Sequence, residues 1–289
     1  MIDQADKLRR LSGSSVFRSA ASVDRKARVV AITSGKGGVG KTNIAVNITM
    51  ALAAKGKRAI IIDADIGLAN VDVIMGVSPK FDLSTVLRGE KSIHDIITRG
   101  PGGVGFIAGG VVNKDLLDIR DWQIDKLAAG FAELDNMYDV IIIDTGAGVS
   151  QHVMSFVLAA PEVIVVTTQE PTSIADAYRM LKAISLKESG SINRLVVNRA
   201  SSAQDAKNTF NRLNRVSNQY LGMPLNYLGY IRDDTAVSTS VMRQAPFIIE
   251  FPESMAAVDI QRLADNLSMG APDGGGFRGF FSKMTKMFN

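Results

Sequence analysis

A glycine-rich segment, SGKGGVGKT over residues 34–42, constrains the fold of this chain more than any other feature. It directly follows the β-branched run VVAIT and leads into the helix-forming run NIAVNITMALAAKG. A strand, a glycine loop and a helix in this order form a phosphate-binding loop, because the backbone N–H groups of the loop and the helix N-terminus converge on an anion. The sequence therefore predicts a P-loop fold that binds a polyphosphate, and the flanking strand and helix disfavour a chance glycine turn.

Each position of this loop has a predicted role in holding ATP and Mg²⁺, the two cofactors that the motif implies. Lys41 would neutralise the β and γ oxygens, and the Thr42 hydroxyl would ligate Mg²⁺. The other positions that we expect to contact the nucleotide are Gly35, Lys36, Gly37, Gly38, Val39, Gly40 and Asn43. No serine, cysteine or histidine nucleophile is required, because phosphoryl transfer depends on positioning and charge neutralisation.

The remainder of the chain up to residue 267 alternates short β-branched runs with helix-like stretches. Strands are predicted at residues 29–33, 59–63, 105–107, 140–144, 163–168, 195–198 and 227–230. The run VIIID is continuously apolar, which is typical of a central strand buried on both faces. We therefore expect an α/β fold, a mostly parallel sheet with helices on both faces, in one domain over residues 29–272. Helical extensions are predicted at residues 1–28 and 273–289.

Composition excludes several classes of protein. The 289 residues include no cysteine, which rules out disulfides, thiolate zinc sites and cysteine-ligated iron–sulfur clusters and favours a reducing cytoplasm. We expect neither a secretory signal nor a transmembrane helix, which needs roughly 18 apolar residues. Residues 1–28 contain seven Lys/Arg and three Asp/Glu, residues 273–289 contain three and one, and the remainder contains 23 and 25. The excess positive charge behind the net charge of +4 therefore lies at the two ends of the sequence, and the middle is slightly acidic. This distribution does not predict nucleic-acid binding.

The second lysine of the loop, Lys36, gives the arrangement KGGxGK[ST]. This arrangement resembles the deviant Walker A family, which includes MinD, ParA and the arsenical-pump ATPase. The resemblance implies an ATP-dependent homodimer in which Lys36 reaches the phosphates bound by the partner subunit. Lys36, Lys41 and the water-orienting residue that matches Asp65 would be the catalytic residues.

Two acidic segments lie where the same family places its Mg²⁺ site. The segment DADIGLANVD contributes Asp63, which would support the metal site, and Asp65. The segment IIIDTGAG resembles a Walker B strand that leads into switch II, so Asp144 would hold Mg²⁺. A solvated acidic turn is the alternative for the first segment, although its place at a strand end beside the P-loop favours the metal site.

The base pocket is predicted from the strand RLVVNR. Asn198 matches the asparagine that reads adenine in MinD-like proteins, and Arg199 follows it; ordinary turn chemistry is the alternative. In the next segment, GYIRDD, Arg232 replaces the proline that these proteins usually have. The segment EPTSIAD, residues 170–176, is expected to begin a helix capped by Thr172 or Ser173, and in the resembling proteins it lies at the dimer interface.

The final segment, FRGFFSKMTKMFN, has an apolar stripe at helical spacing with cations outside it. The stripe consists of Phe277, Phe280, Phe281, Met284, Met287 and Phe288. Bulky apolar residues on one face and Arg278, Lys283 and Lys286 on the other are typical of a helix that lies in the plane of an anionic membrane. Packing against the chain's own domain is the alternative, and a core complete at Leu267 would disfavour it.

The beginning of the chain narrows the resemblance further. The pattern DQAxxLR, formed by Asp3, Gln4, Ala5, Leu8 and Arg9, resembles the activating helix of the FlhG group (also called FleN) of MinD-like ATPases. In that group the helix stimulates FlhF, a signal-recognition-type GTPase.

This resemblance implies an ATPase switch that controls flagellar number or assembly. Its implied partners are a second copy, an FlhF-type GTPase, anionic lipid, flagellar switch proteins and a flagellar transcription activator, with no sequence-specific nucleic acid. The implied location is the cytoplasm and the inner face of the cytoplasmic membrane. A MinD-type septum-site regulator is the alternative, followed by a ParA-type DNA-partition ATPase.

Overall fold

The computed structural model describes residues 26–65, 70–110, 121–187, 190–269, 276–285 and 287. The predicted activator residues Asp3, Gln4, Ala5, Leu8 and Arg9 lie outside these ranges, as does Phe288. Among the residues described, no helix is long and apolar enough to cross a membrane.

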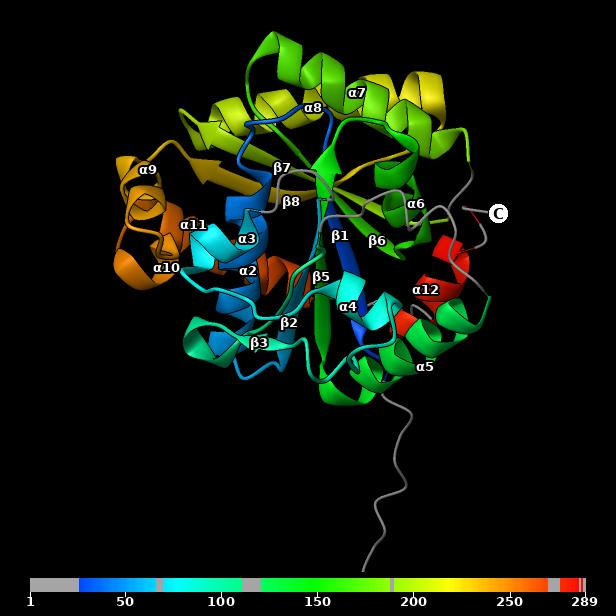
Figure 1. Ribbon diagram of the computed structural model, residues 1–289. Helices are drawn as coiled ribbons and strands as arrows, with labels where there is room; N and C mark the ends of the chain where they lie inside the picture. The colour runs from blue at the N-terminus through cyan, green and yellow to red at the C-terminus, as the bar shows by residue number, and fades with distance from the viewer. Residues whose placement is uncertain are drawn as a thin grey trace, which may run out of the picture.

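An eight-stranded sheet forms the centre of the molecule, in the order β3-β4-β2-β5-β1-β6-β7-β8 (Figure 1). The strands are β1 (Arg28–Ser34), β2 (Ala59–Ala64), β3 (Thr98–Arg99), β4 (Gly105–Ile107), β5 (Val140–Ala147), β6 (Glu162–Thr167), β7 (Ile192–Ala200) and β8 (Asn226–Arg232). All neighbours pair in parallel except β3, which is antiparallel to β4. The predicted α/β class and all seven predicted strands are confirmed. The two-residue strand β3 was not predicted, because two residues carry no detectable periodicity.

Helices cover both faces of this sheet (Figure 1). They are α2 (Lys41–Ala54), α3 (Val71–Met75), α4 (Leu83–Leu87), the 3₁₀ turn η1 (Pro101–Gly103), α5 (Asp121–Met137), α6 (Gln151–Ala159), α7 (Pro171–Ser185), α8 (Ala203–Leu221), α9 (Thr235–Met242), α10 (Phe247–Glu250), α11 (Met255–Ser268) and α12 (Gly276–Thr285). Side chains of α2, α3, α10 and α11 share one core cluster, and those of α4 to α8 and α12 share the other. The sheet is therefore buried on both sides, as the continuous apolar strands predict.

A buried charge cluster holds the edge of the sheet where β1 and β6 begin. Glu162 is fully buried and accepts hydrogen bonds from Arg28 at 2.5 and 2.8 Å and from Arg194 at 3.0 Å. Arg28 also donates to the carbonyl of Leu267 at the end of α11. Two guanidinium groups compensate one carboxylate here, which keeps its burial from being prohibitive. The cluster ties three strands and the last helix of the domain together at the edge opposite the P-loop.

The C-terminal helix α12 packs against the domain. The ring centroids of Phe277 and Phe281 lie 4.9 and 4.8 Å from the ring centroid of Phe131 on α5. The ring of Phe280 stacks on that of Phe156 on α6, with 6.4 Å between centroids. The three C-terminal phenylalanines are only 2 to 3% exposed. The expectation that the core is complete at Leu267 is therefore wrong, because α5 and α6 leave an apolar groove that α12 fills. Met284 is partly buried in the same cluster, and Met287 is 37% exposed.

Candidate nucleotide-binding site

The P-loop joins β1 to α2 at the carboxyl edge of the sheet. Gly38 and Gly40 have φ values of 77° and 90°, left-handed conformations that L side chains rarely adopt. Gly40 is also the N-cap of α2, and no side chain caps this helix. By contrast, serine or aspartate side chains cap α6, α8, α9 and α11. The first N–H groups of α2 are thus left for an anion, which is the arrangement a phosphate requires.

Two close approaches explain why this loop needs glycine. A Cβ on Gly35 would lie 2.1 Å from the carbonyl oxygen of Asp176 on α7, and a Cβ on Gly40 would lie 2.2 Å from the Asn198 amide. Asn198 is buried and donates to the carbonyl of Val39 at 2.7 Å. The structure thus gives Asn198 a bracing contact on the P-loop backbone, and adenine recognition by this residue stays a prediction.

Lys41, at the first position of α2, forms a buried ion pair with Asp144 of β5, with Nζ and Oδ1 2.8 Å apart. Burial raises the pKa of Asp144, and the neighbouring Lys41 and a hydrogen bond from Thr42 oppose that rise. The three residues that sequence assigned to phosphate and metal binding are therefore in contact. When nucleotide and metal bind, Lys41 can exchange Asp144 for a phosphate, and Asp144 can exchange Lys41 for a metal ion.

Two further carboxylates lie beside this pair. Asp63 of β2 is the register partner of Asp144 and accepts hydrogen bonds from the backbone N–H groups of Asp65, Asn70 and Val71 at 3.0 to 3.4 Å. Burial, followed by the charge of Asp144, raises the pKa of Asp63 to about 7. A metal ion beside these groups would relieve both effects, since it favours the ionised form.

Asp65 lies against residues 146–148, the predicted switch II. A Cβ built on Gly146 would be 3.4 Å from Asp65 Oδ1, so the carboxylate faces the last residues of β5. Directly after β5, the Gly148 N–H donates to the carbonyl of Ser34 at 2.9 Å, which links the predicted switch II to the start of the P-loop. The predicted water-orienting group therefore lies beside the predicted switch II.

The donor set fits Mg²⁺ held jointly with a nucleotide. In the parts of the chain that are described, no group of three His, Cys, Asp or Glu side chains could hold a metal alone. Magnesium commonly takes one or two protein oxygens plus phosphates, which Thr42 and Asp144 would provide. Two buried oxygens next to the loop, Thr33 Oγ1 and Asn43 Oδ1, have no hydrogen-bond partner. When bound, Mg²⁺ would neutralise the phosphate charge that develops during hydrolysis.

The second lysine of the loop is held by its own subunit. Lys36 Nζ lies 2.8 Å from Glu170 Oε2 and 3.2 Å from Thr172 Oγ1, at the start of α7. The hydrogen bond and charge of Lys36, with a smaller contribution from Arg199, lower the pKa of Glu170. Sequence reasoning placed this segment near the dimer interface but did not identify Glu170 as a partner of Lys36, because 134 residues separate the two in sequence.

The predicted cap of α7 is wrong. Glu170 occupies the N-cap position without a side-chain cap, and Pro171 follows it at the first helical position. The Ser173 hydroxyl instead accepts from the Thr168 N–H at 3.0 Å and contacts Thr167 Oγ1 at 3.0 Å. This leaves the Thr172 hydroxyl free of a capping role and able to bind Lys36.

Replacing Glu170 by glutamine removes the negative charge that holds Lys36 within its own subunit. We therefore expect ATP-dependent dimerisation to strengthen, and only by about two- to fivefold, because an exposed ion pair restrains Lys36 modestly. Sedimentation of the variant with ATP would measure the dimer dissociation constant. Glu90→Gln is the matched control, because Glu90 is a similarly exposed carboxylate that pairs with Arg88 and not with Lys36. An unchanged or weaker dimer in the Glu170 variant would show that Glu170 does not restrain Lys36.

The arginine that replaces the usual proline in the base-pocket segment has a structural partner. Arg232 Nε and Nη2 bind the two oxygens of Asp259 on α11 at 2.8 and 2.9 Å. The Arg232 N–H adds a third bond to the same carboxylate at 3.1 Å. Arg232 therefore fixes the end of β8 to α11. Arg199, at the end of β7, is exposed with φ 52°.

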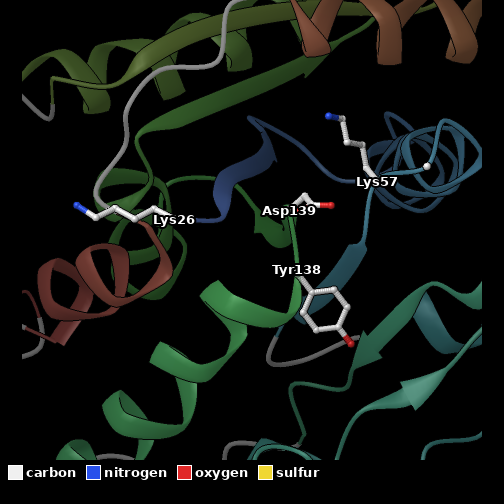
Figure 2. Close-up of a pocket in the computed structure, with 5 residues that line it drawn as sticks. Lys26, Lys57, Tyr138 and Asp139 are labelled. Carbon is white, nitrogen blue, oxygen red and sulfur yellow. The ribbon is translucent and has the colours of Figure 1, made fainter. Parts of the chain in front are cut away.

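Two cavities, of about 410 and 590 Å³, lie at the opposite edge of the sheet. In the smaller one, Figure 2 shows Lys26 extending away from Asp139, and the Tyr138 ring pointing away from Lys57. Arg58 is already committed to Asp139 at 2.7 Å. Helices α2 and α5 both end here, and Arg58 also donates to the carbonyl of Asn136 in the last turn of α5. The side chains therefore do not converge on a ligand.

Comparison with known proteins agrees with the site at the P-loop. The CobQ/CobB/MinD/ParA nucleotide binding domain matches residues 30–247. The antiactivator FleN of Pseudomonas aeruginosa is 38% identical over 240 residues, covering 83% of this chain and 86% of that protein. The flagellum site-determining protein YlxH of Helicobacter pylori is 31% identical over 294 residues, covering 99% of both proteins.

Among solved structures, the septum site-determining protein MinD of Pyrococcus horikoshii, complexed with Mg-ADP, is similar with a TM-score of 0.68. The identity is 26%, and the match covers 84% of this chain and 96% of that one. The strand order, the P-loop with its second lysine and these relatives agree with one another. The chain belongs to the CobQ/CobB/MinD/ParA nucleotide-binding family, as an ATPase of the MinD-like, FleN-related type.

Proposed function

We propose that this ATPase is a membrane-associating switch that controls flagellar number or placement. ATP would bind with Mg²⁺ at the P-loop and join two copies through Lys36. The dimer would associate with anionic lipid at the inner face of the cytoplasmic membrane through α12, and residues 1–11 would stimulate an FlhF-type GTPase. The observation that carries this proposal is the similarity to FleN and to YlxH, the latter over 99% of both chains, together with the assembled P-loop.

Deletion of the gene tests the biological role directly. A changed number or position of flagella with normal septa supports the proposal. Displaced septa with normal flagella would instead favour the MinD-type alternative, which the 31% identity to Bacillus subtilis MinD keeps in view. The name of FleN, an antiactivator, further suggests a flagellar transcription activator as a partner, and flagellar switch proteins are the other candidates.

A second experiment tests the GTPase partner. A peptide of residues 1–11 is expected to stimulate GTP hydrolysis by an FlhF-type protein, and its Gln4→Ala, Arg9→Ala form is expected not to. The full chain lacking residues 1–11 should keep its ATPase activity and its ATP-dependent dimer. A peptide without effect on the GTPase would remove this partner from the proposal.

The membrane proposal must account for a helix whose apolar face is buried against α5 and α6. A short amphipathic helix binds lipid only marginally by itself, whereas two helices in one dimer raise the effective concentration of each other. Helix α6 begins directly after switch II, and Phe156 on α6 lies against Phe280 of α12. A nucleotide-dependent shift of switch II therefore has a short path to the docked helix.

We expect ATP, but not ADP, to promote cosedimentation of the protein with anionic vesicles, and high salt to weaken it. Phe281→Glu should abolish this binding without changing nucleotide affinity, because it places a charge in the apolar face. Ser282→Glu is the control, since Ser282 is exposed on the same helix. Vesicle binding that persists in the Phe281 variant would contradict the role of α12. ATP-dependent binding to random duplex DNA would favour the ParA-type alternative.

A further inference from the structure

The carboxylate of Asp135, near the end of α5, accepts hydrogen bonds from backbone N–H groups near both ends of the described chain. Asp135 Oδ1 accepts hydrogen bonds from the N–H of Ala27 at 3.1 Å and from the N–H of Phe277 at 2.6 Å. Asp135 Oδ2 accepts from the N–H of Arg278 at 3.2 Å. More than 100 residues separate Asp135 from each donor in sequence. The carboxylate thus bridges the segment that leads into β1 and the first turn of α12.

For α12, Asp135 acts as a cap supplied by another helix. The first residue of α12 is Gly276, with φ 70°, which has no side chain to cap the helix. A Cβ on Gly276 would lie 2.7 Å from Asp135 Oδ2, so glycine is needed for the carboxylate to approach. Phe131, which packs against Phe277 and Phe281, lies one turn earlier on α5. The cap and the apolar contact therefore hold α12 on the same face of α5.

For the N-terminal side, Asp135 fixes the point where the chain enters the core. Ala27 is 3% exposed and belongs to the same core cluster as the three phenylalanines of α12. Its N–H shares an oxygen atom with the N–H of Phe277, so each donor helps to orient the acceptor of the other. Hydrogen bonds to an ionised group are stronger than those between neutral groups, which makes this shared acceptor effective.

We propose that Asp135 couples the path of the N-terminal segment to the docking of α12. Drawing the Ala27 N–H away from Asp135 weakens the cap and releases α12, and undocking α12 loosens Ala27 by the same factor, because coupling between sites is reciprocal. This inference rests on the proposed function for its biological meaning: a partner that takes up and redirects the N-terminal segment would also free the membrane helix.

Hydrogen–deuterium exchange on the full chain, without nucleotide or lipid, tests the coupling. Ala27→Pro removes the donor N–H and fixes φ of residue 27 at about −65°, and exchange across residues 276–285 should accelerate about fivefold, the effect of losing a typical helix cap. Lys26→Pro is the matched control and should leave these residues protected. Asp135→Ala should accelerate exchange at least as much, and Asp135→Asn, which keeps one acceptor oxygen, should restore most of the protection.

The reverse direction uses Phe281→Glu, in which exchange at the Ala27 amide should also accelerate. If Asp135→Ala loosens α12 while Ala27→Pro does not, Asp135 is a helix cap only and the coupling is overturned. Unchanged exchange at Ala27 in the Phe281 variant overturns it as well, and this arm remains decisive if Ala27→Pro does not fold. Because no vesicle or GTPase is present, the exchange experiment tests the coupling even if the proposed membrane or partner role is wrong.

Discussion

Replacing Lys41 by alanine is expected to lower ATP hydrolysis by about a thousandfold, the effect of removing one preorganised charge from a phosphoryl-transfer site. The lysine is a buried cation at the N-terminus of α2, 2.8 Å from Asp144, and no other described cation is paired with this carboxylate. Its loss removes positive charge from the phosphate cradle and leaves a buried carboxylate unpaired. Phosphate release with Mg-ATP and binding of a fluorescent ATP analogue should both fall.

Lys36→Ala provides the contrast, because Lys36 lies at the exposed rim and binds Glu170 and Thr172. This variant should bind ATP nearly as well as the unmodified protein but fail to dimerise and therefore fail to hydrolyse. Size exclusion with ATP separates the two variants. A Lys36→Ala protein that dimerises normally would refute the role taken from the deviant Walker A resemblance, and normal turnover in Lys41→Ala would refute the P-loop assignment.

The second large effect is expected at Asp65. Asp65→Ala should bind ATP with nearly unchanged affinity and hydrolyse it about a hundredfold more slowly, because a water-positioning group acts in the chemical step and not in phosphate binding. The carboxylate lies beside Gly146 and is not part of the Lys41–Asp144 ion pair that is predicted to hold phosphate and metal. An ATP-bound dimer should accumulate, measurable by sedimentation and single-turnover kinetics.

Asp72→Ala is the matched control for this variant. Asp72 lies in the first turn of α3, where its Oδ1 accepts from the Val73 N–H at 2.8 Å. Its removal should reduce stability slightly and leave the rate of hydrolysis unchanged. Equal loss of activity in both variants would assign the effect to the segment between β2 and α3, and normal turnover in Asp65→Ala would transfer the water-positioning role elsewhere.

Local pattern predicted the sheet and the P-loop well, because their determinants lie within short stretches of sequence. Left-handed glycines and an uncapped helix N-terminus follow from SGKGGVGKT alone, and buried parallel strands follow from continuous apolar runs. The pairing of Lys36 with Glu170, and that of Arg232 with Asp259, could not be predicted. Both depend on which strand ends become neighbours, and no local periodicity encodes that arrangement.

The C-terminal helix shows a second limit of sequence reasoning. A stripe of phenylalanine opposite lysine and arginine suits a lipid surface and a groove between two helices equally well, since both bury one apolar face. The groove is created by Phe131 and Phe156, residues of two helices that precede α12 by more than a hundred positions. Only the packing of α5 and α6 shows that this groove exists.

The position of β1 in the sheet has a consequence for biosynthesis. β1 pairs with β5 and β6, whose partner residues extend to Val166, so the strand that supports the P-loop cannot complete its pairing until residue 166 has been made. Parallel pairing over such separations is slow and leaves apolar strands exposed during folding. Phe131 is covered later still, because α12 follows β6 by more than a hundred residues. Nascent chains are therefore expected to depend on chaperones until α12 has been made.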